Sequence, residues 1–220
     1  MQSTHKMLFT SLVLSFALVP VAHAHVSFVA NNAYAGKSYI ATAVIPHGCE
    51  DLSAIKYDTL QIAISIPPGF TGVRPADSAF GPATVEKDAD GNVTRLIWTK
   101  AAAALAEDTH FIQVSFRGTL PNAPLTALEL ETTQTCVGGT SRTWSGVDVP
   151  KLRILPSRAP GWNKYTAQSL IDTSMLSSYF SDAVIVWSNN AAYSANPVTD
   201  SLITNKLSEI PQGAEYWVKY

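Results

Sequence analysis

The stretch LQIAISIPPGF, residues 60–70, predicts the fold of the larger part of this chain. Apolar side chains occupy every second position from Leu60 to Ile66, which is the period of a strand with one buried face. The run then meets Pro67-Pro68-Gly69, a sequence that breaks strands. We therefore expect a half-buried strand over residues 60–66 that ends in a turn.

Similar runs recur along the first two thirds of the chain, each bounded by Gly, Pro, Asn or Asp. They cover residues 25–30, 37–45, 93–99, 111–118 and 125–133. Short strands at this spacing, with no long helix between them, predict an antiparallel β-sandwich over residues 25–155. The sequence also predicts the structure of two connections between these strands. DADGN (88–92) predicts a hairpin turn in which Asp90-Gly91 supplies positive φ, and KAAAALA (100–106) predicts a single helical turn or a helical loop.

The composition changes near Pro156, in the Pro- and Gly-rich stretch PSRAPGW. The residues after this stretch predict a strand over 183–187, a helix over 198–210 opened by Pro197, and a terminal strand over 214–220. This pattern indicates a small α+β appendage over residues 156–220. Because a segment of roughly 65 residues has a marginal core alone, we expect it to lean on the sandwich.

Residues 1–24 have the features of a secretory signal peptide. A lysine-bearing start is followed by the apolar run MLFTSLVLSFALVPVA and by Ala22-His23-Ala24, an Ala-x-Ala cleavage site. A membrane anchor is the alternative, but the run is shorter than the ~20 residues of a spanning helix and contains Pro20. We expect cleavage after Ala24, a secreted or periplasmic protein, and no transmembrane segment after cleavage.

The charge balance and the cysteine count narrow the expected partners and the chemistry of the two cysteines. Residues 25–220 carry 14 basic and 17 acidic side chains, a formal charge of −3, with no basic block. Nucleic acid and anionic membranes are therefore not the expected partners. In an oxidising compartment an even cysteine count predicts a disulfide, here between Cys49 and Cys136. The alternative, a redox-active or metal-thiolate pair, lacks a Cys-x-x-Cys motif.

Cleavage after Ala24 would make His25 the first residue. Its α-amine and imidazole Nδ1 could then chelate one metal ion in a six-membered ring, and tetragonal N/O coordination suits Cu(II). The alternative is that a histidine at the cleavage site is incidental. On the residues alone, His25 is a candidate copper ligand.

Further candidates come from the two cysteine segments. His47 lies in IPHGCED, beside Cys49 and near Glu50 and Asp51, and Trp144 follows Cys136 by eight residues. A disulfide would bring these segments together, so His47 could complete a site and the Trp144 indole could shield a bound cation. A turn histidine facing water and a core tryptophan are the alternatives. His110, at the start of a strand, is expected to be structural or exposed.

The motifs AHAHVSF, AGKSYIATAVIPHGCED, IAISIPPGF, VSFRGTLP and TTQTCVGGTSRTWSG together resemble the YcnI-like copper-binding domain family, formerly a domain of unknown function. The resemblance covers roughly residues 25–155. It implies an immunoglobulin- or fibronectin-like β-sandwich that binds one Cu(II) through a mono-histidine brace, an acidic side chain and a tryptophan. It also implies a role in copper homeostasis.

Carried onto this chain, the resemblance assigns the brace to His25 and the tryptophan to Trp144. The acid is where the chain departs from the family pattern, because Pro46-His47-Gly48-Cys49 replaces the glutamate form. We expect His47 in the vacant position, with Glu50 or Asp51 as alternatives.

The leading hypothesis is therefore a secreted Cu(II) carrier or metallochaperone, not an enzyme, with another copper-handling protein as a partner. No nucleophile motif, phosphate loop or His-Glu-x-x-His sequence is present. The alternative is a copper-dependent monooxygenase of the lytic polysaccharide type, in which His47 or His110 would be the second histidine. A third hypothesis, an adhesive or structural sandwich, predicts no copper binding.

Overall fold

The computed structural model describes residues 25–50, 55–108 and 110–220. The predicted signal peptide, residues 1–24, lies outside the described residues, as does Asp51. Within the described part, no helix has both the length and the apolar character needed to cross a membrane.

Strands dominate the structure. Those of the first part are β1 (Ser27–Phe28), β2 (Asn32–Tyr34), β3 (Ser38–Ile45), β4 (Cys49–Glu50), β5 (Lys56–Tyr57), β6 (Thr59–Ser65), β7 (Thr71–Pro75), β8 (Ala83–Lys87), β9 (Val93–Thr99), β10 (Ile112–Thr119), β11 (Thr126–Glu129), β12 (Thr132–Cys136), β13 (Ser141–Trp144) and β14 (Lys151–Leu155). Two short 3-10 turns flank β13, namely η1 (Val137–Gly139) and η2 (Gly146–Asp148). The second part contains β15 (Trp162–Thr166), α1 (Thr173–Tyr179), β16 (Ile185–Ser188), β17 (Ala191–Tyr193), α2 (Pro197–Ser201) and β18 (Glu215–Lys219).

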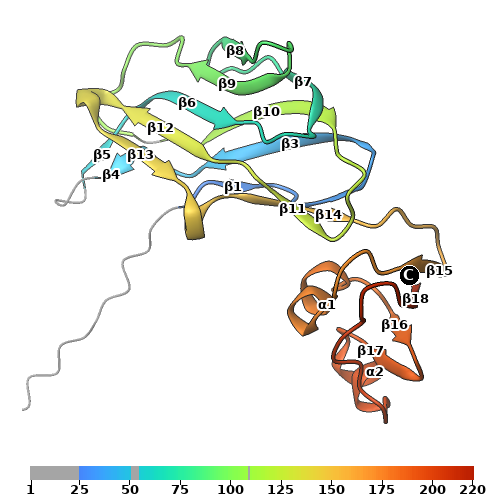
Figure 1. Cartoon of the computed structure of the whole chain (residues 1–220). Coiled ribbons are helices and arrows are strands. Elements are labelled where there is room, and N and C mark those ends of the chain that lie inside the picture. The colour runs from blue at the N-terminus through green and yellow to red at the C-terminus, as the bar shows by residue number, and fades with distance from the viewer. Residues whose placement is uncertain (1–24, 51–54, 109) are drawn as a thin grey trace, which may run out of the picture.

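Two antiparallel sheets form the predicted sandwich (Figure 1). One has the order β1-β3-β10-β7 and the other the order β13-β12-β6-β9-β8. Their inner faces share one core, in which the rings of Trp98 on β9 and Phe116 on β10 lie 6.4 Å apart. A smaller sheet, β11-β14-β2, extends the sandwich and pairs β14 with β2 in parallel. The fold class predicted from the alternating runs is confirmed.

Residues 60–66 behave as their alternation predicts. They form β6 and continue into Ile66, and the side chains of Ile62, Ile64 and Ile66 are buried in the core while Leu60 is half-buried. The predicted hairpin is also present, between β8 and β9, although only Gly91 has a positive φ, +83°. Hydrogen bonds from Asn92 hold the pKa of the Asp88 carboxyl in this turn below its usual value.

Two predicted helical segments are wrong. Residues 100–106 form an irregular loop, because the N–H groups of Lys100 and Ala101 donate to carbonyls of neighbouring chain segments (both 2.8 Å) and that of Leu105 donates to Asp58 Oδ2 (2.7 Å). The helix predicted over 198–210 ends at Ser201 as α2. Beyond it the chain is irregular: the N–H groups of Leu207 and Ile210 donate to carbonyls of other segments, both at 2.8 Å.

Residues 156–220 form a second body, which we call the C-terminal unit. Its sheet has the order β15-β18-β16-β17 and encloses a core of its own with α1, a helix that the sequence did not predict. Figure 1 shows this unit beside the end of the sandwich where β11 and β14 lie. Leu155 and Tyr34 of the sandwich pack against its core. The Arg158 guanidinium lies over the rings of Tyr34 and Tyr220 at the junction.

Candidate functional site

His25 lies at the rim of the sandwich, in a hollow of about 280 Å³ formed with the turn after β13. Strand β1 fixes its position, because Val26 and Phe28 are buried in the core and Ser27 pairs with Val44 of β3. The His25 and Asp148 side chains are 48% and 51% exposed, and His25 Nε2 lies 3.4 Å from Asp148 Oδ1. A half-exposed histidine therefore faces a carboxylate that the sequence did not reveal as a site residue.

Which ring nitrogen of His25 faces this carboxylate decides how the pair could bind a metal ion. A chelate with the His25 α-amine uses Nδ1, and Nε2 points away from that chelate. A carboxylate at Nε2 favours the tautomer with the proton on Nε2, which is the tautomer that metal binding through Nδ1 requires. The donor chemistry of His25 and Asp148 thus fits a histidine that binds a metal through its amine and Nδ1.

Local backbone geometry sets the position of Asp148. It ends η2, where the Asp148 N–H donates to the Ser145 carbonyl at 3.2 Å and Gly146 adopts φ +60°. The only sequence signal was that an acid follows Trp144 by four residues. That signal is too weak to predict the contact, because it says nothing of where β1 runs.

His47 lies after the end of β3, and its side chain contacts residues of its own loop. Its Nδ1 is 2.7 Å from the Gly48 carbonyl oxygen and its Nε2 is 3.9 Å from Glu50 Oε2. Gly48 has no room for a side chain, since a Cβ there would lie 1.8 Å from the Tyr57 carbonyl oxygen. The close approach of β5 thus explains the glycine in PHGC.

The structure does not bring the predicted metal ligands into one cluster. His25 faces Asp148, while His47 faces Glu50. Among residues 25–50, 55–108 and 110–220, no three His, Cys, Asp or Glu side chains gather in a way that could hold a metal ion. Continuing the β1–β3 register would place His25 opposite Pro46, so the two histidines belong to the same end of the sheet.

Trp144 is buried in the sandwich core, only 2% exposed, and does not line the hollow beside His25. Its indole Nε1 has no hydrogen-bond partner among the described residues. The Arg142 guanidinium lies 5.6 Å from its ring centroid. Trp144 is thus a core tryptophan in the structure, and its predicted role beside a bound cation stays a prediction.

The predicted disulfide is confirmed. Cys49 and Cys136 are bonded and buried, joining β4 to the end of β12 across 87 positions of sequence. The Gln134 side-chain amide strengthens the same junction by donating to the His47 carbonyl (2.9 Å) and to Thr59 Oγ1 (2.7 Å). The disulfide thus fixes the backbone around His47 as expected.

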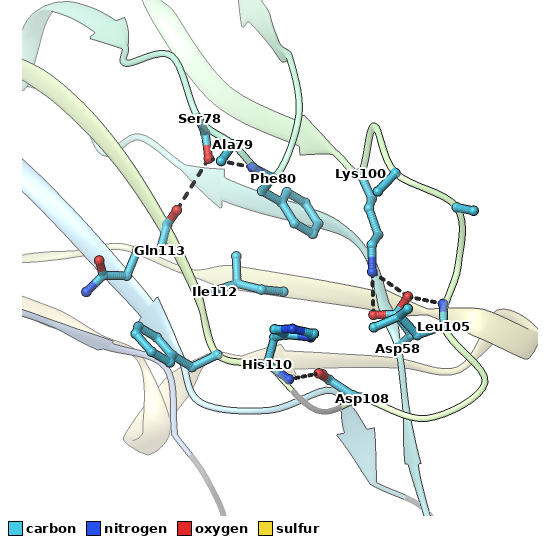
Figure 2. Close-up of a pocket in the computed structure, with 13 residues that line it drawn as sticks. Asp58, Ser78, Ala79, Phe80, Lys100, Leu105, Asp108, His110, Ile112 and Gln113 are labelled. Atoms are coloured by element: carbon cyan, nitrogen blue, oxygen red, sulfur yellow. Dashed lines mark hydrogen bonds and ion pairs between the residues drawn. The ribbon is translucent and has the colours of Figure 1, made fainter.

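A second pocket, of about 600 Å³, lies between the loop 101–108 and β10 (Figure 2). On one side Asp58, only 2% exposed, accepts from Lys100 Nζ and from the Leu105 N–H, both at 2.7 Å. On the other, Asp108 Oδ1 accepts from the His110 N–H at 2.9 Å. Phe80 and Ile112 contribute apolar lining, and Ser78 and Gln113 contribute polar lining, as Figure 2 shows.

The pairing of Asp58 with Lys100 has no sequence signal, because the two residues are 42 positions apart and carry no motif. Their charges neutralise each other in a buried setting, and together with the Leu105 hydrogen bond they tie the loop to Asp58, the residue between β5 and β6. This arrangement is that of a structural ion pair. His110 lines the pocket and is exposed, in keeping with the expectation for it.

One comparison with a solved structure agrees with the fold. A protein from Nocardia farcinica whose crystal structure reveals an immunoglobulin-like fold matches with a TM-score of 0.50 and 18% identity, over 60% of this chain and 98% of that one. A cohesin module of a Clostridium perfringens family 33 glycoside hydrolase matches with a TM-score of 0.35 and 10% identity, over 60% and 97% of the two chains. No curated protein matches the chain.

The family comparison covers more than half of the chain. The model of the domain of unknown function DUF1775 matches residues 25–163, which span the whole sandwich and begin at His25. This chain therefore belongs to the DUF1775 family, the YcnI-like family.

Proposed function

We propose that this protein carries one Cu(II) ion per chain, held by His25 after residues 1–24 have been removed, and that it delivers copper rather than catalysing a reaction. The observation that carries the proposal is the half-exposed His25 ring with the Asp148 carboxylate on its Nε2 side. The copper ion is the cargo of the protein in this proposal.

The chemistry follows from what cleavage would create. A free amine and an Nδ1 lone pair on one residue form a chelate for a borderline metal, and Cu(II) tops the divalent affinity series for such nitrogen donors. Asp148 would act as a positioning residue, because a carboxylate on the remote ring nitrogen fixes the orientation and tautomer of a metal-binding histidine. The His47–Glu50 pair at the same end of the sheet is the proposed source of a further ligand.

The location of the protein belongs to the same proposal. The family match begins at His25, immediately after the predicted cleavage site, and Cys49 and Cys136 form a disulfide typical of oxidising compartments. Both observations support a secreted or periplasmic protein. In such a compartment Cu(II) is the stable oxidation state, which suits nitrogen and oxygen donors.

The test compares the chain that begins at His25 with one that keeps Ala24 in front of it. Cu(II) titration by calorimetry and electron paramagnetic resonance should show one tightly bound ion in the first chain. The second chain should lose tight binding, because its amine has become an amide. Equal binding by the two chains would contradict the proposal, as would the absence of binding by the first.

Two variants refine the same titration. Asp148→Ala should weaken Cu(II) binding by about 10- to 100-fold, the usual effect of removing a carboxylate that orients a ligand. His110→Ala is the matched control and should bind as the parent chain does. If the copper-loaded protein released oxidised sugars from chitin or cellulose with a reductant, the carrier role would be replaced by that of a monooxygenase.

A further inference from the structure

The sheet of the C-terminal unit buries one face and leaves much of the other exposed over β15, β18 and β16. Side chains on alternate positions, such as Tyr216 and Val218 of β18 and Val186 of β16, pack with α1 in the core. The residues between them point the opposite way. We call this opposite surface the aromatic face, and its members are Trp162, Lys164 and Thr166 of β15, Glu215, Trp217 and Lys219 of β18, and Ile185 and Trp187 of β16.

The strand register places three tryptophans of this face on three neighbouring strands. Trp187 pairs with Trp217, which in turn pairs with Lys164 on the far side. Trp162 lies one pair further along, opposite Lys219. Trp187 and Trp217 are therefore direct cross-strand neighbours, and Trp162 lies diagonally from Trp217 on the next strand. At these spacings large side chains can form a continuous surface.

Two of the three indoles are open to solvent. Trp162 is 53% exposed and Trp187 is 40% exposed, while Trp217 between them is half-buried. Burying an aromatic side chain is a main source of folding free energy, so an exposed pair contributes little to the stability of the unit. Trp98 and Trp144 lie buried in the sandwich core, so the exposure of tryptophan is specific to this face.

The charges on the face indicate what kind of molecule can cover it. Lys164 Nζ lies 2.6 Å from Glu215 Oε1 and 5.7 Å from the Trp217 ring centroid, so the central cation is already neutralised. Residues 156–220 carry four basic and five acidic side chains, a formal charge of −1. The face itself carries Lys164, Lys219 and Glu215, a formal charge of +1, whereas nucleic acids and anionic lipids are bound by clusters of several unpaired cations. The interleaved Lys and Glu also make the centre too polar for the apolar core of a protein interface.

A neutral sugar polymer matches both properties of the face. Each pyranose ring offers axial C–H groups to the electron-rich face of an indole and hydroxyl groups to side chains such as Lys164 and Glu215. A β-1,4-linked chain is extended and flat, so its rings can lie on the exposed indoles of Trp162 and Trp187, whereas an α-linked chain coils away. We propose that the aromatic face binds a neutral β-1,4-linked glycan and thereby attaches the protein to a polysaccharide surface.

The test uses the whole chain from His25 onward. Depletion onto microcrystalline cellulose and onto chitin, and tryptophan fluorescence with cellohexaose and chitohexaose, should reveal binding to at least one polymer and its hexamer, with none to amylose. Trp162→Ala/Trp187→Ala should reduce the affinity at least about tenfold. The matched control is Leu202→Ala, a side chain that is 79% exposed on the same unit but outside the sheet.

The double variant could also fail to fold, so Trp162→Tyr/Trp187→Tyr is included, which keeps an aromatic ring at each position and should retain most of the binding. Absence of binding to both polymers by the parent chain would overturn the proposal. Undiminished binding by the alanine variant would do the same, as would a tryptophan-dependent dimer in sedimentation, since a second copy would then cover the face. The result is independent of copper, because Asp148→Ala should bind the glycan as the parent chain does.

Discussion

Tryptophan has opposite environments in the two parts of this chain. In the sandwich, Trp98 and Trp144 lie between two sheets that cover each other. In the C-terminal unit, Trp162 and Trp187 stand on a sheet that is covered on one face only. The comparison teaches that sheet layering, not residue type, decides whether an aromatic side chain stabilises the fold or is available to a ligand.

The largest expected effect comes from the disulfide, which lies wholly within the sandwich. Replacing both partners, Cys49→Ala/Cys136→Ala, should lower the free energy of unfolding of the sandwich by about 4 to 5 kcal/mol, because the open chain gains the entropy of a long loop. Hydrogen exchange measured by mass spectrometry should show faster exchange in β6 and β12. Strands β15 and β18 should change little, and an equal acceleration there would mean that the two parts unfold as one.

The second prediction compares two tryptophans directly. Trp98→Ala should destabilise the protein by about 3 to 5 kcal/mol, since it leaves a large cavity between the sheets. Trp187→Ala should change the free energy of unfolding by no more than about 0.5 kcal/mol, the usual range at an exposed position. Urea denaturation followed by circular dichroism measures both. Similar losses in the two variants would show that the aromatic face is a structural element.

The smallest effect concerns the junction between the two parts. The Arg158 guanidinium lies 4.2 Å from the Tyr220 ring centroid and 5.2 Å from that of Tyr34, and its Nη1 lies 2.6 Å from Asp182 Oδ2. Burial raises the pKa of the Tyr220 hydroxyl, so Tyr220 remains neutral beside the cation over the ordinary pH range. Arg158→Met should cost about 1 kcal/mol through the lost cation–π contacts.

Differential scanning calorimetry should show this change as a broader or split transition, because Arg158 connects the sandwich to the C-terminal unit. The matched control is Lys206→Met, which removes an exposed cation that pairs with Asp200 at 2.7 Å within the unit. An exposed ion pair contributes little, so the control should leave the transition unchanged. A split transition in the control but not in Arg158→Met would show that Arg158 does not hold the two parts together.

Much of the sandwich could be predicted because alternation is a local property. Residues 60–66 and 112–119 form strands whose buried side chains are the apolar ones of the pattern. The helical predictions failed where local preference met competing partners. Residues 100–106 contain strong helix formers, yet Asp58 and the neighbouring strands bind their backbone N–H groups.

The candidate site divides in the same way. His25 was predictable, because the cleavage signal and the first residue after it are adjacent in sequence. Asp148 was not, because 123 positions separate it from His25 and only the path of β1 beside the turn after β13 brings the two together. The aromatic face was equally hidden, since its tryptophans lie in three segments whose register no local pattern encodes.

By itself, the sequence determined the strands, the turn at Gly91 and the one disulfide that two cysteines allow, because alternation, positive φ and pairing depend on residue type and count. Only the tertiary structure decided that Trp144 fills the core, that Asp148 faces His25 and that three tryptophans share an open sheet face. The physical reason is that strand register and sheet layering set these contacts, and both are fixed by interactions between segments far apart in the chain.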